Sequence, residues 1–308
     1  MIKTEHLSKR YGDLVAVDDL NFEVRPGEVL GFLGPNGAGK TTTMRMLTGF
    51  VAPSAGRASI FSHDVERDPI AAKRCIGYLP EGAPAYGEMS AIGFLEFIAD
   101  LRGLRGATRR TRLATVIERL ALGPVLQQSI ETLSKGFRRR VGLAAAIVHD
   151  PAVLILDEPT DGLDPNQKHE VRALIGEMSR DKIIVISTHI LEEVDAVCTR
   201  AVIISRGRLV ADDTPAGLAA RSRYHNAVTV QLEQPAQLEA ARAALAALPL
   251  AASVEVDARD ARLTVLPGGT GALAPSVSEC FARAGIAVTA QRVEAGRLDE
   301  VFRTLTQA

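Results

Sequence analysis

Short apolar runs alternate with amphipathic segments along most of the chain before residue 222. The runs at 29–33 and 153–156 are bounded by glycines or charged residues, which is typical of buried strands. Asp164 and Pro165 are suited to begin a helix, as its N-cap and its first residue. The pattern predicts a mostly parallel sheet covered by helices, with strands at 14–24, 29–33, 58–61, 75–79, 153–156, 183–187 and 202–205 and helices at 40–47 and 190–197.

A helical stretch interrupts this alternation. Apolar residues recur at helical spacing over about 90–122, and a further helix is expected over 134–148. We therefore expect a helical subdomain at about 85–150, inserted in an α/β domain that covers 1–222.

The character of the sequence changes after residue 222. Strands are expected at 228–232, 254–257, 262–266 and 288–293, helices at 236–248 and 273–284, and a last helix at 298–305. The order βαββαβ is that of the ferredoxin-like split motif. The sequence therefore predicts a small C-terminal α+β domain over 223–308, ferredoxin-like in topology.

Charge narrows the class of partner. The 308 residues carry a formal net charge of −1, which gives no electrostatic reason to expect nucleic acid as a partner. The arginines within 102–112 are interpreted as a solvated helix face, with contact to a protein or to lipid headgroups as the alternative.

Cysteine use and hydropathy indicate a compartment. Three cysteines stand far apart, form no metal-binding spacing and suggest no disulfide framework, so a reducing, cytoplasmic location fits best. The first residues contain no apolar targeting segment. The longest near-apolar stretch, 141–148, is far shorter than the ~18–20 residues of a membrane span. If the protein works at a membrane, another chain is expected to supply the span.

A glycine-rich loop follows the strand at 29–33 and opens the next helix, with the sequence Gly34-Pro35-Asn36-Gly37-Ala38-Gly39-Lys40-Thr41-Thr42. Glycines let several backbone N–H groups point at phosphate oxygens, and the helix N-terminus adds partial positive charge. Lys40 is expected to reach the β- and γ-phosphates, and Thr41 to offer its hydroxyl to Mg²⁺. A coincidental glycine turn is the alternative, and the strand–loop–helix context argues against it.

Two carboxylates follow the apolar run at 153–156. Asp157 and Glu158 are expected at the carboxyl edge of the sheet, where α/β proteins bind ligands. Asp157 is placed to hold Mg²⁺ through water, and Glu158 is the candidate general base for an attacking water. Two acids after a strand more often form a capped turn. Paired with the phosphate loop, they indicate Mg²⁺-dependent hydrolysis of a nucleoside triphosphate.

The order and spacing of five motifs over roughly 1–222 resemble those of the ATP-binding cassette (ABC) ATPases. The motifs are 34–41, Leu133-Ser134-Lys135-Gly136-Phe137, 154–158, 160–164 and Ser187-Thr188-His189. The resemblance implies a P-loop NTPase fold with a RecA-like core and a helical subdomain, and ATP and Mg²⁺ as cofactors. A narrower likeness, to the detached ATPase subunits of ABC-2-type exporters (drug-export, gliding-motility and copper-maturation cassettes), comes from Tyr78-Leu79-Pro80-Glu81 and Leu298-Asp299-Glu300-Val301-Phe302.

The resemblance also implies a mechanism. Two copies are expected to form a head-to-tail dimer that encloses two ATP molecules, each bound between the phosphate loop of one copy and Ser134 and Gly136 of the other. Ser134 would cap a helix whose N-terminus faces the γ-phosphate. His189 is expected to contact the γ-phosphate and support hydrolysis, with a plain polar loop residue as the alternative. Tyr11 is expected to stack on adenine, unless it is only a surface or packing tyrosine.

Three positions depart from the family pattern. The usual signature is Leu-Ser-Gly-Gly-Gln, but Lys135 replaces the first Gly and Phe137 the Gln, which puts ribose-side contacts in doubt. Glu81 stands where most cassettes carry a Gln that contacts the metal or the attacking water. A carboxylate still coordinates Mg²⁺, so we expect altered affinity or metal dependence with activity retained. For the arginines at 138–140, a contact with phosphate or the partner and a solvated face both stay open.

The leading hypothesis is an ATP-hydrolysing motor that drives a separate membrane permease from the cytoplasmic face. The permease is expected to dock near Glu81 and the segment 84–89. One alternative is a soluble ABC ATPase acting on nucleic acid or ribosomes, but relatives of that kind commonly carry paired cassettes, long coiled coils or zinc insertions. Another is a non-hydrolysing regulatory cassette, against which Glu158 and His189 argue. The tail domain is interpreted as a packing appendage, with dimer stabilisation, permease docking and ligand sensing as alternatives.

Overall fold

The computed structural model describes residues 1–82, 86–269 and 271–307 and divides the chain into two compact units, Met1–Thr214 and Pro215–Ala308. The sequence placed this boundary at 222, after the short helix α8 (Pro215–Ala219). In the structure α8 belongs to the second unit, where it packs against the last helix, α11 (Leu298–Gln307).

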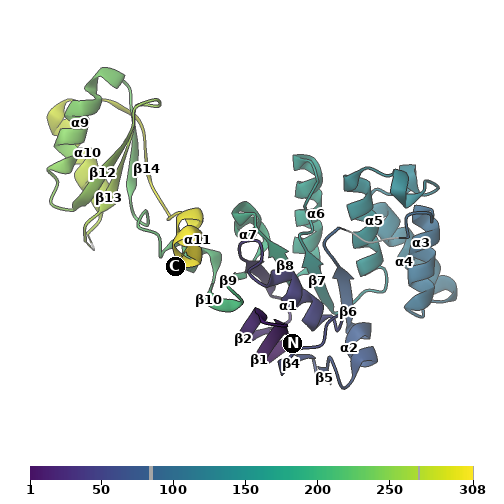
Figure 1. The fold of residues 1–308 in the computed structure, drawn as a ribbon. Helices are drawn as coiled ribbons and strands as arrows, with labels where there is room; N and C mark the ends of the chain where they lie inside the picture. The colour runs from purple at the N-terminus through teal and green to yellow at the C-terminus, as the bar shows by residue number, and fades with distance from the viewer. Residues whose placement is uncertain (83–85, 270, 308) are drawn as a thin grey trace. The chain divides into compact units, whose positions relative to one another are not determined.

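A six-stranded sheet in the order β10-β9-β3-β8-β7-β6 forms the centre of the first unit (Figure 1). The five strands from β9 to β6 are parallel to one another, and β10 pairs antiparallel at one edge. The strands are β3 (Val29–Leu33), β6 (Ile76–Leu79), β7 (Val153–Asp157), β8 (Ile183–Thr188), β9 (Arg200–Ser205) and β10 (Arg208–Asp213). Because β8 lies between β3 and β7, the carboxyl ends of these three strands meet at one point of the sheet edge.

Successive residues of the central strands serve two different cores. On β7, Leu154 and Leu156 belong to one cluster of buried side chains, whereas Val153 and Ile155 belong to the other. Since side chains alternate across a strand, the two clusters lie on opposite faces of the sheet. This two-sided burial explains why the parallel strands are continuous apolar runs in the sequence.

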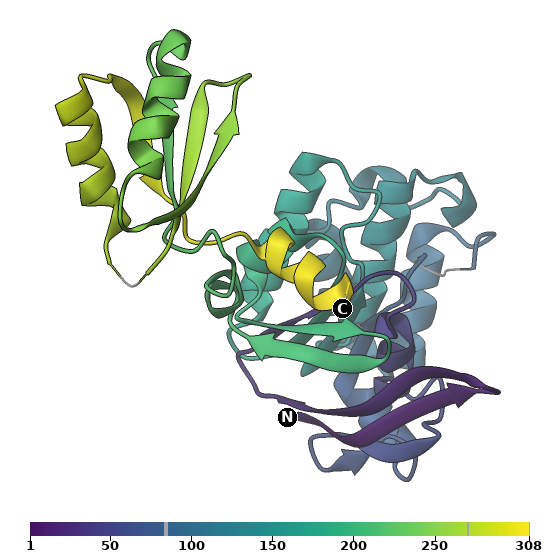
Figure 2. The same cartoon turned by 60° about the vertical axis from the view of Figure 1, so that its left-hand side comes forward.

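The first unit also contains a four-stranded antiparallel sheet in the order β2-β1-β4-β5. Its strands are β1 (Ile2–Tyr11), β2 (Leu14–Val24), β4 (Ala55–Ile60) and β5 (His63–Asp64), and the long β1–β2 pair is plain in Figure 2. Buried side chains of β1 and β2 pack with those of β3 and α1 (Lys40–Leu47), for example Phe22 against Phe32 with ring centroids 5.7 Å apart.

Seven α-helices belong to the described part of the first unit. They are α1, α2 (Pro69–Cys75), α3 (Ala91–Leu101), α4 (Gly106–Arg119), α5 (Lys135–Ile147), α6 (Pro165–Met178) and α7 (Leu191–Val197), with 3₁₀ turns at Gly123–Val125 and Ile130–Thr132. The helices α3, α4 and α5 lie together at one side of the unit (Figure 1). They share a core that includes Leu95, Leu113 and Leu143.

The second unit is built around a four-stranded antiparallel sheet in the order β12-β13-β11-β14. Its chain order is β11 (Val228–Leu232), a 3₁₀ turn (Pro235–Gln237), α9 (Leu238–Ala246), β12 (Ala251–Asp257), β13 (Arg262–Pro267), α10 (Leu273–Ala284) and β14 (Val288–Val293). The predicted order βαββαβ is confirmed. Leu245 of α9 and Phe281 of α10 pack with Val230 and Leu263 of the sheet, so the two helices cover one sheet face.

The predicted strands and helices of the first unit are confirmed, and Asp164 is the N-cap of α6, accepting a hydrogen bond from the backbone N–H of Gln167. Strands β1, β5 and β10 and helices α2 and α8 were not predicted from the sequence. Strand β1 was not predicted because its partly exposed side chains are polar. Hydrogen bonds to β2 and β4 hold its backbone on both sides. Among the described residues, no helix is long and apolar enough to cross a bilayer.

Candidate functional site

The loop at 34–39 joins β3 to α1 through backbone conformations and close approaches that require glycine. Gly37 and Gly39 have φ angles of 80° and 107°, in the left-handed region. At Gly34 a Cβ atom would lie 2.6 Å from the carbonyl oxygen of Ile204, and at Gly39 it would lie 2.5 Å from that of Ala16. Only glycine fits at these two positions, and the loop between them exposes Pro35, Asn36 and Gly37 to solvent.

Lys40 turns its side chain back beneath this loop. It is 6% exposed, and its ammonium Nζ donates to the carbonyl oxygen of Gly34 at 2.7 Å and to that of Pro35 at 3.2 Å. Burial lowers the pKa of Lys40, and the nearby carboxylates of Glu158, Asp157 and Glu81 oppose this shift. The structure therefore places a buried cation between the glycine loop and a set of acids. Thr41 and Thr42, half-buried, begin the helix beside it.

Asp157 ends β7 and is fully buried. Its Oδ1 accepts a hydrogen bond from the hydroxyl of Ser187, which lies opposite it on β8. Its Oδ2 is buried and has no hydrogen-bond partner among the described residues. A buried carboxylate oxygen left unpaired is costly, and a cation or its water shell satisfies it, so the residue fits the expected role toward Mg²⁺.

Metal-binding side chains do not cluster at this point. Within the described residues, no group of three or more His, Cys, Asp or Glu side chains is arranged to hold a metal ion. A magnesium ion in phosphoryl transfer takes most of its ligands from phosphate and water, with one or two from protein side chains. The hydroxyl of Thr41 and the carboxylate of Asp157 match that requirement.

Glu158 follows Asp157 in a left-handed backbone conformation, with φ of 51°. Its backbone N–H donates to the carbonyl oxygen of Ser187 at 3.0 Å and to the Ser187 hydroxyl at 3.2 Å. Its carboxylate Oε1 lies 3.0 Å from Nδ1 of His189, and the two side chains are 18% and 52% exposed. The pair is thus open to solvent on the side of the imidazole, and the carboxylate can accept a proton from a water bound there.

Ser134 and Gly136 lie at the start of α5. The exposed Ser134 caps this helix, because its hydroxyl accepts a hydrogen bond from the backbone N–H of Phe137 at 3.3 Å. A Cβ atom at Gly136 would lie 2.6 Å from the amide oxygen of Gln167 on α6. Within the described residues, no hydrogen bond connects Ser134 with the phosphate loop of the same chain.

Comparison with known proteins settles the family. The family model described as ABC transporter matches residues 17–161. The daunorubicin resistance ATP-binding protein DrrA3 of Streptomyces coeruleorubidus is 37% identical over 310 residues, which cover 99% of this chain and 95% of DrrA3. The chain belongs to the ABC transporter family of ATP-binding proteins.

Other relatives of this ABC protein match over a part of this chain. The probable multidrug ABC transporter ATP-binding protein YbhF of Escherichia coli is 33% identical over 235 residues, and the chain spans only 40% of its length. A solved structure of an ATP binding subunit of an ABC transporter is 30% identical, with a TM-score of 0.68 over 72% of this chain and 92% of that one. The dimeric cassette MJ0796 shares the fold, with a TM-score of 0.65 at 22% identity.

Two further residues that we expect at the nucleotide site of this chain, Tyr11 and Glu81, are exposed to solvent. Tyr11 ends β1 with its ring 46% exposed, and the ammonium of Lys9 lies 5.2 Å from the ring centroid. Glu81 is exposed just after β6, and its charge contributes to the electrostatic environment of Lys40. Both positions remain open to a nucleotide or a partner.

Of the two alternatives left open for the arginines at 138–140, the solvated face does not hold for Arg139 and Arg140, which are only 5% and 8% exposed. Arg140 binds Glu170 of α6 at 2.8 Å, and Arg139 reaches the backbone around Asp157. A weak signal in the sequence could have indicated this burial, because the three arginines lie on a helix whose other residues are nearly all apolar.

A buried carboxylate near the site was not predicted from the sequence. Glu193 of α7, 4% exposed, accepts hydrogen bonds from the hydroxyls of Thr160 and Thr188, the latter at 2.8 Å. Thr160 follows the Glu158 turn and Thr188 precedes His189. One buried carboxylate thus fixes the two segments that carry the catalytic candidates.

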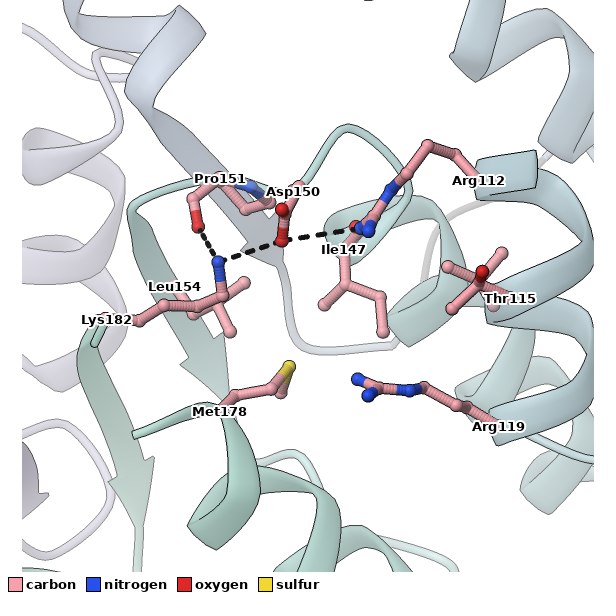
Figure 3. Close-up of a pocket in the computed structure, with 10 residues that line it drawn as sticks. Arg112, Thr115, Arg119, Ile147, Asp150, Pro151, Leu154, Met178 and Lys182 are labelled. Atoms are coloured by element: carbon pink, nitrogen blue, oxygen red, sulfur yellow. Dashed lines mark hydrogen bonds and ion pairs between the residues drawn. The ribbon is translucent and has the colours of Figure 1, made fainter. Parts of the chain in front are cut away.

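A small cavity of about 30 Å³ lies between α4, the end of α5 and β7 (Figure 3). The guanidinium of Arg112 donates to the carbonyls of Ile147 and Val148 at 2.9 Å, and Asp150 bridges it to Lys182. These contacts cap the C-terminus of α5, because Arg112 satisfies two of its last carbonyl oxygens. The expected solvated face at 102–112 is therefore wrong for Arg112, which has a structural role.

Proposed function

We propose that this chain is the ATP-hydrolysing subunit of an exporter, which drives a separate membrane permease. The observation that carries the proposal is the position of Lys40, buried under the glycine loop and within the electrostatic reach of Asp157 and Glu158. A phosphate chain that enters the loop would replace the two carbonyl contacts of the Lys40 ammonium with charged oxygens.

The residues divide the chemistry among them. The amides of 34–39 and the Lys40 ammonium hold the β- and γ-phosphates, and Tyr11 stacks on adenine. Mg²⁺, held by Thr41 and Asp157 with Glu81 close by, would neutralise the developing phosphate charge. Glu158 accepts the proton of the attacking water, and His189, hydrogen-bonded to Glu158, orients that carboxylate and contacts the γ-phosphate.

A second copy of the chain completes each site. Ser134 and Gly136 belong to a helix N-terminus that is exposed at Ser134 and forms no hydrogen bond with the described phosphate loop of its own chain. An anion bound at that N-terminus gains from the helix dipole and the unpaired N–H groups. The γ-phosphate bound to one copy would therefore attract this helix of the other and close a head-to-tail dimer.

The permease would dock beside Glu81. Tyr86 and Phe97 are 61% and 42% exposed, and their rings lie 5.7 Å apart edge to face, with Phe94 packed beneath Tyr86 at 6.3 Å. Exposed aromatic clusters of this kind are typical of protein contacts. Pro84, also expected there, lies outside the described residues.

The export assignment draws on the relatives. DrrA3 is named for daunorubicin resistance, and the Nod factor export ATP-binding protein I of Paraburkholderia xenovorans is 37% identical over 220 residues. The chain would work at the cytoplasmic face of the membrane. The first unit, which contains the nucleotide-binding residues, would carry the activity, and the second unit would be an appendage that binds no ligand.

The test is purification of the tagged chain from native membranes with ATP and Mg²⁺, using Glu158→Gln to retain unhydrolysed ATP. We expect one integral membrane protein to copurify in a constant ratio. Lys40→Ala should not recover it, because this variant lacks the ammonium that binds the ATP phosphates. Recovery of nucleic acid or ribosomal proteins in place of a membrane protein would overturn the permease assignment. Wild-type ATPase activity no higher than that of Glu158→Gln would overturn the hydrolysis assignment.

A further inference from the structure

Arg139 makes four hydrogen bonds, and all of them go to main-chain carbonyls near the catalytic carboxylate. Its Nη1 donates to Pro80 at 2.8 Å, its Nε to Pro159 at 3.4 Å, and its Nη2 to both Asp157 and Glu158. One planar side chain of α5 thus joins the end of β6 to the turn after β7.

Arg139 is 5% exposed, and its guanidinium forms no ion pair with a carboxylate inside the described ranges. Burial lowers the pKa of Arg139, opposed by Asp157, Asp161, Glu158 and Glu81 at longer range. A buried charge that bonds only to carbonyl oxygens and has no carboxylate paired with it is costly compared with an apolar side chain of the same size. The burial of Arg139 is therefore not explained by packing alone.

The peptide units on both sides of Glu158 are held. Ser187 accepts the hydrogen bond of its N–H, and Arg139 donates to its carbonyl oxygen. A left-handed φ of 51° at a residue with a side chain costs of order 1 kcal/mol and persists only where neighbours enforce it. Arg139 and Ser187 are two of those neighbours, and the third is the backbone N–H of Asp161, which donates to the Glu158 carbonyl oxygen at 3.1 Å. The direction of the Glu158 carboxylate therefore depends in part on Arg139.

We propose that Arg139 is a positioning residue for hydrolysis, which fixes the Glu158 backbone relative to the helix that begins at Ser134. The inference rests on the proposed ATPase function. Through Pro80 the same side chain also fixes the backbone just before Glu81. A movement of α5, the helix that would receive ATP from the second copy, is thereby transmitted to the general base and to the expected docking segment.

Lysine cannot take over this role. Its ammonium is a single point with three tetrahedral donors, whereas the guanidinium presents five donors in one plane and here reaches four carbonyls. Arg139→Lys keeps the charge and most of the volume but releases at least one of the carbonyls. Loss of a fixed geometry by about 1 Å can cost about 10²-fold in rate.

Arg140→Lys is the matched control. Arg140 is the next residue of the same helix and is similarly buried, but it bonds to Leu120 and Glu170, which lie outside the nucleotide site. The experiment measures Mg²⁺-ATPase kcat and KM, binding of a fluorescent ATP analogue and thermal unfolding for the wild type and for both variants.

We expect Arg139→Lys to lower kcat by about 10²-fold while KM and analogue affinity change less than about threefold, because only an interaction made in the transition state is lost. In a protein that already carries Glu158→Gln, the same substitution should not lower kcat further, because Arg139 acts on the rate through Glu158. Equal kcat values for Arg139→Lys and Arg140→Lys would overturn the inference, as would a further rate loss in the protein that carries Glu158→Gln. Wild-type activity no higher than Glu158→Gln would instead refute the proposed function itself.

Discussion

Nδ1 of His189 lies 3.0 Å from Oε1 of Glu158, although the two residues follow different strands. Strands β7 and β8 are neighbours in parallel register, with Asp157 opposite Ser187, so the residues that follow them emerge side by side. The sequence predicted a catalytic role for each residue separately. Their hydrogen bond shows that they form one unit.

Substitution of this pair should give non-additive losses. We expect Glu158→Gln and His189→Ala each to lower kcat by about 10²-fold or more, since general-base catalysis contributes about 10²–10⁴-fold. The double variant should be no slower than the slower single variant, because the residues act as a unit. Steady-state ATPase assays on the four proteins test this, and multiplication of the two losses in the double variant would show independent roles.

The dimer should depend on the exposed cap of α5. With ATP, Glu158→Gln is expected to elute as a dimer in size-exclusion chromatography, because the uncleaved γ-phosphate joins the two copies. Adding Ser134→Arg should return it to the monomer volume, since a bulky side chain blocks the helix N-terminus. Ser253→Arg, on the exposed part of β12 in the second unit, is the control and should leave the dimer intact. An ATP-bound dimer that tolerates Ser134→Arg would contradict the proposed interface.

Two glycines should respond to alanine in opposite directions. At Gly34 the new methyl group would lie 2.6 Å from the Ile204 carbonyl, so we expect loss of stability by about 1–3 kcal/mol and loss of ATP binding. At Gly176, exposed within α6, nothing lies within 4 Å of the new methyl, and alanine should stabilise by about 0.5–1 kcal/mol. Urea unfolding and analogue binding measure both, and tolerance of Gly34→Ala would refute the close packing.

The free energy of unfolding should decrease below neutral pH, because His149 resists protonation in the folded chain. Its Nε2 donates to the carbonyl oxygen of Ile76 at 3.1 Å and its Nδ1 is buried without a partner among the described residues. Burial, assisted by Arg102, lowers the pKa of His149 to about 4 from an ordinary 6.5. The unfolded chain therefore binds the proton first, and stability present above pH 6.5 is lost as the pH falls toward 4.

The substitution His149→Gln keeps a hydrogen-bond donor for the carbonyl oxygen of Ile76 and removes the titratable imidazole. Between pH 7 and pH 5 we expect the variant to lose about 2 kcal/mol less free energy of unfolding than the wild type. Urea denaturation at the two pH values measures the difference. Equal losses in the two proteins would mean that His149 is accessible to protons in the folded state.

The sequence by itself determined the parts whose chemistry is local. A phosphate loop needs glycine at fixed offsets before a lysine, so 34–41 could be recognised without a structure. The same holds for Asp164 as a helix cap and for the apolar strands of a sheet buried on both faces, because each depends on neighbours in the chain. The βαββαβ order of the second unit was predicted for this reason as well.

Only the tertiary structure decided how distant segments hold one another. Arg139, Glu193 and His149 are polar residues that bond to partners far along the chain, and no periodicity reveals such partners. Strand β1 is defined by hydrogen bonds to β2 and β4 and not by its own apolar pattern. The sequence supplies the groups that bind phosphate, whereas the packing of α5 and β8 around β7 determines where the catalytic carboxylate points.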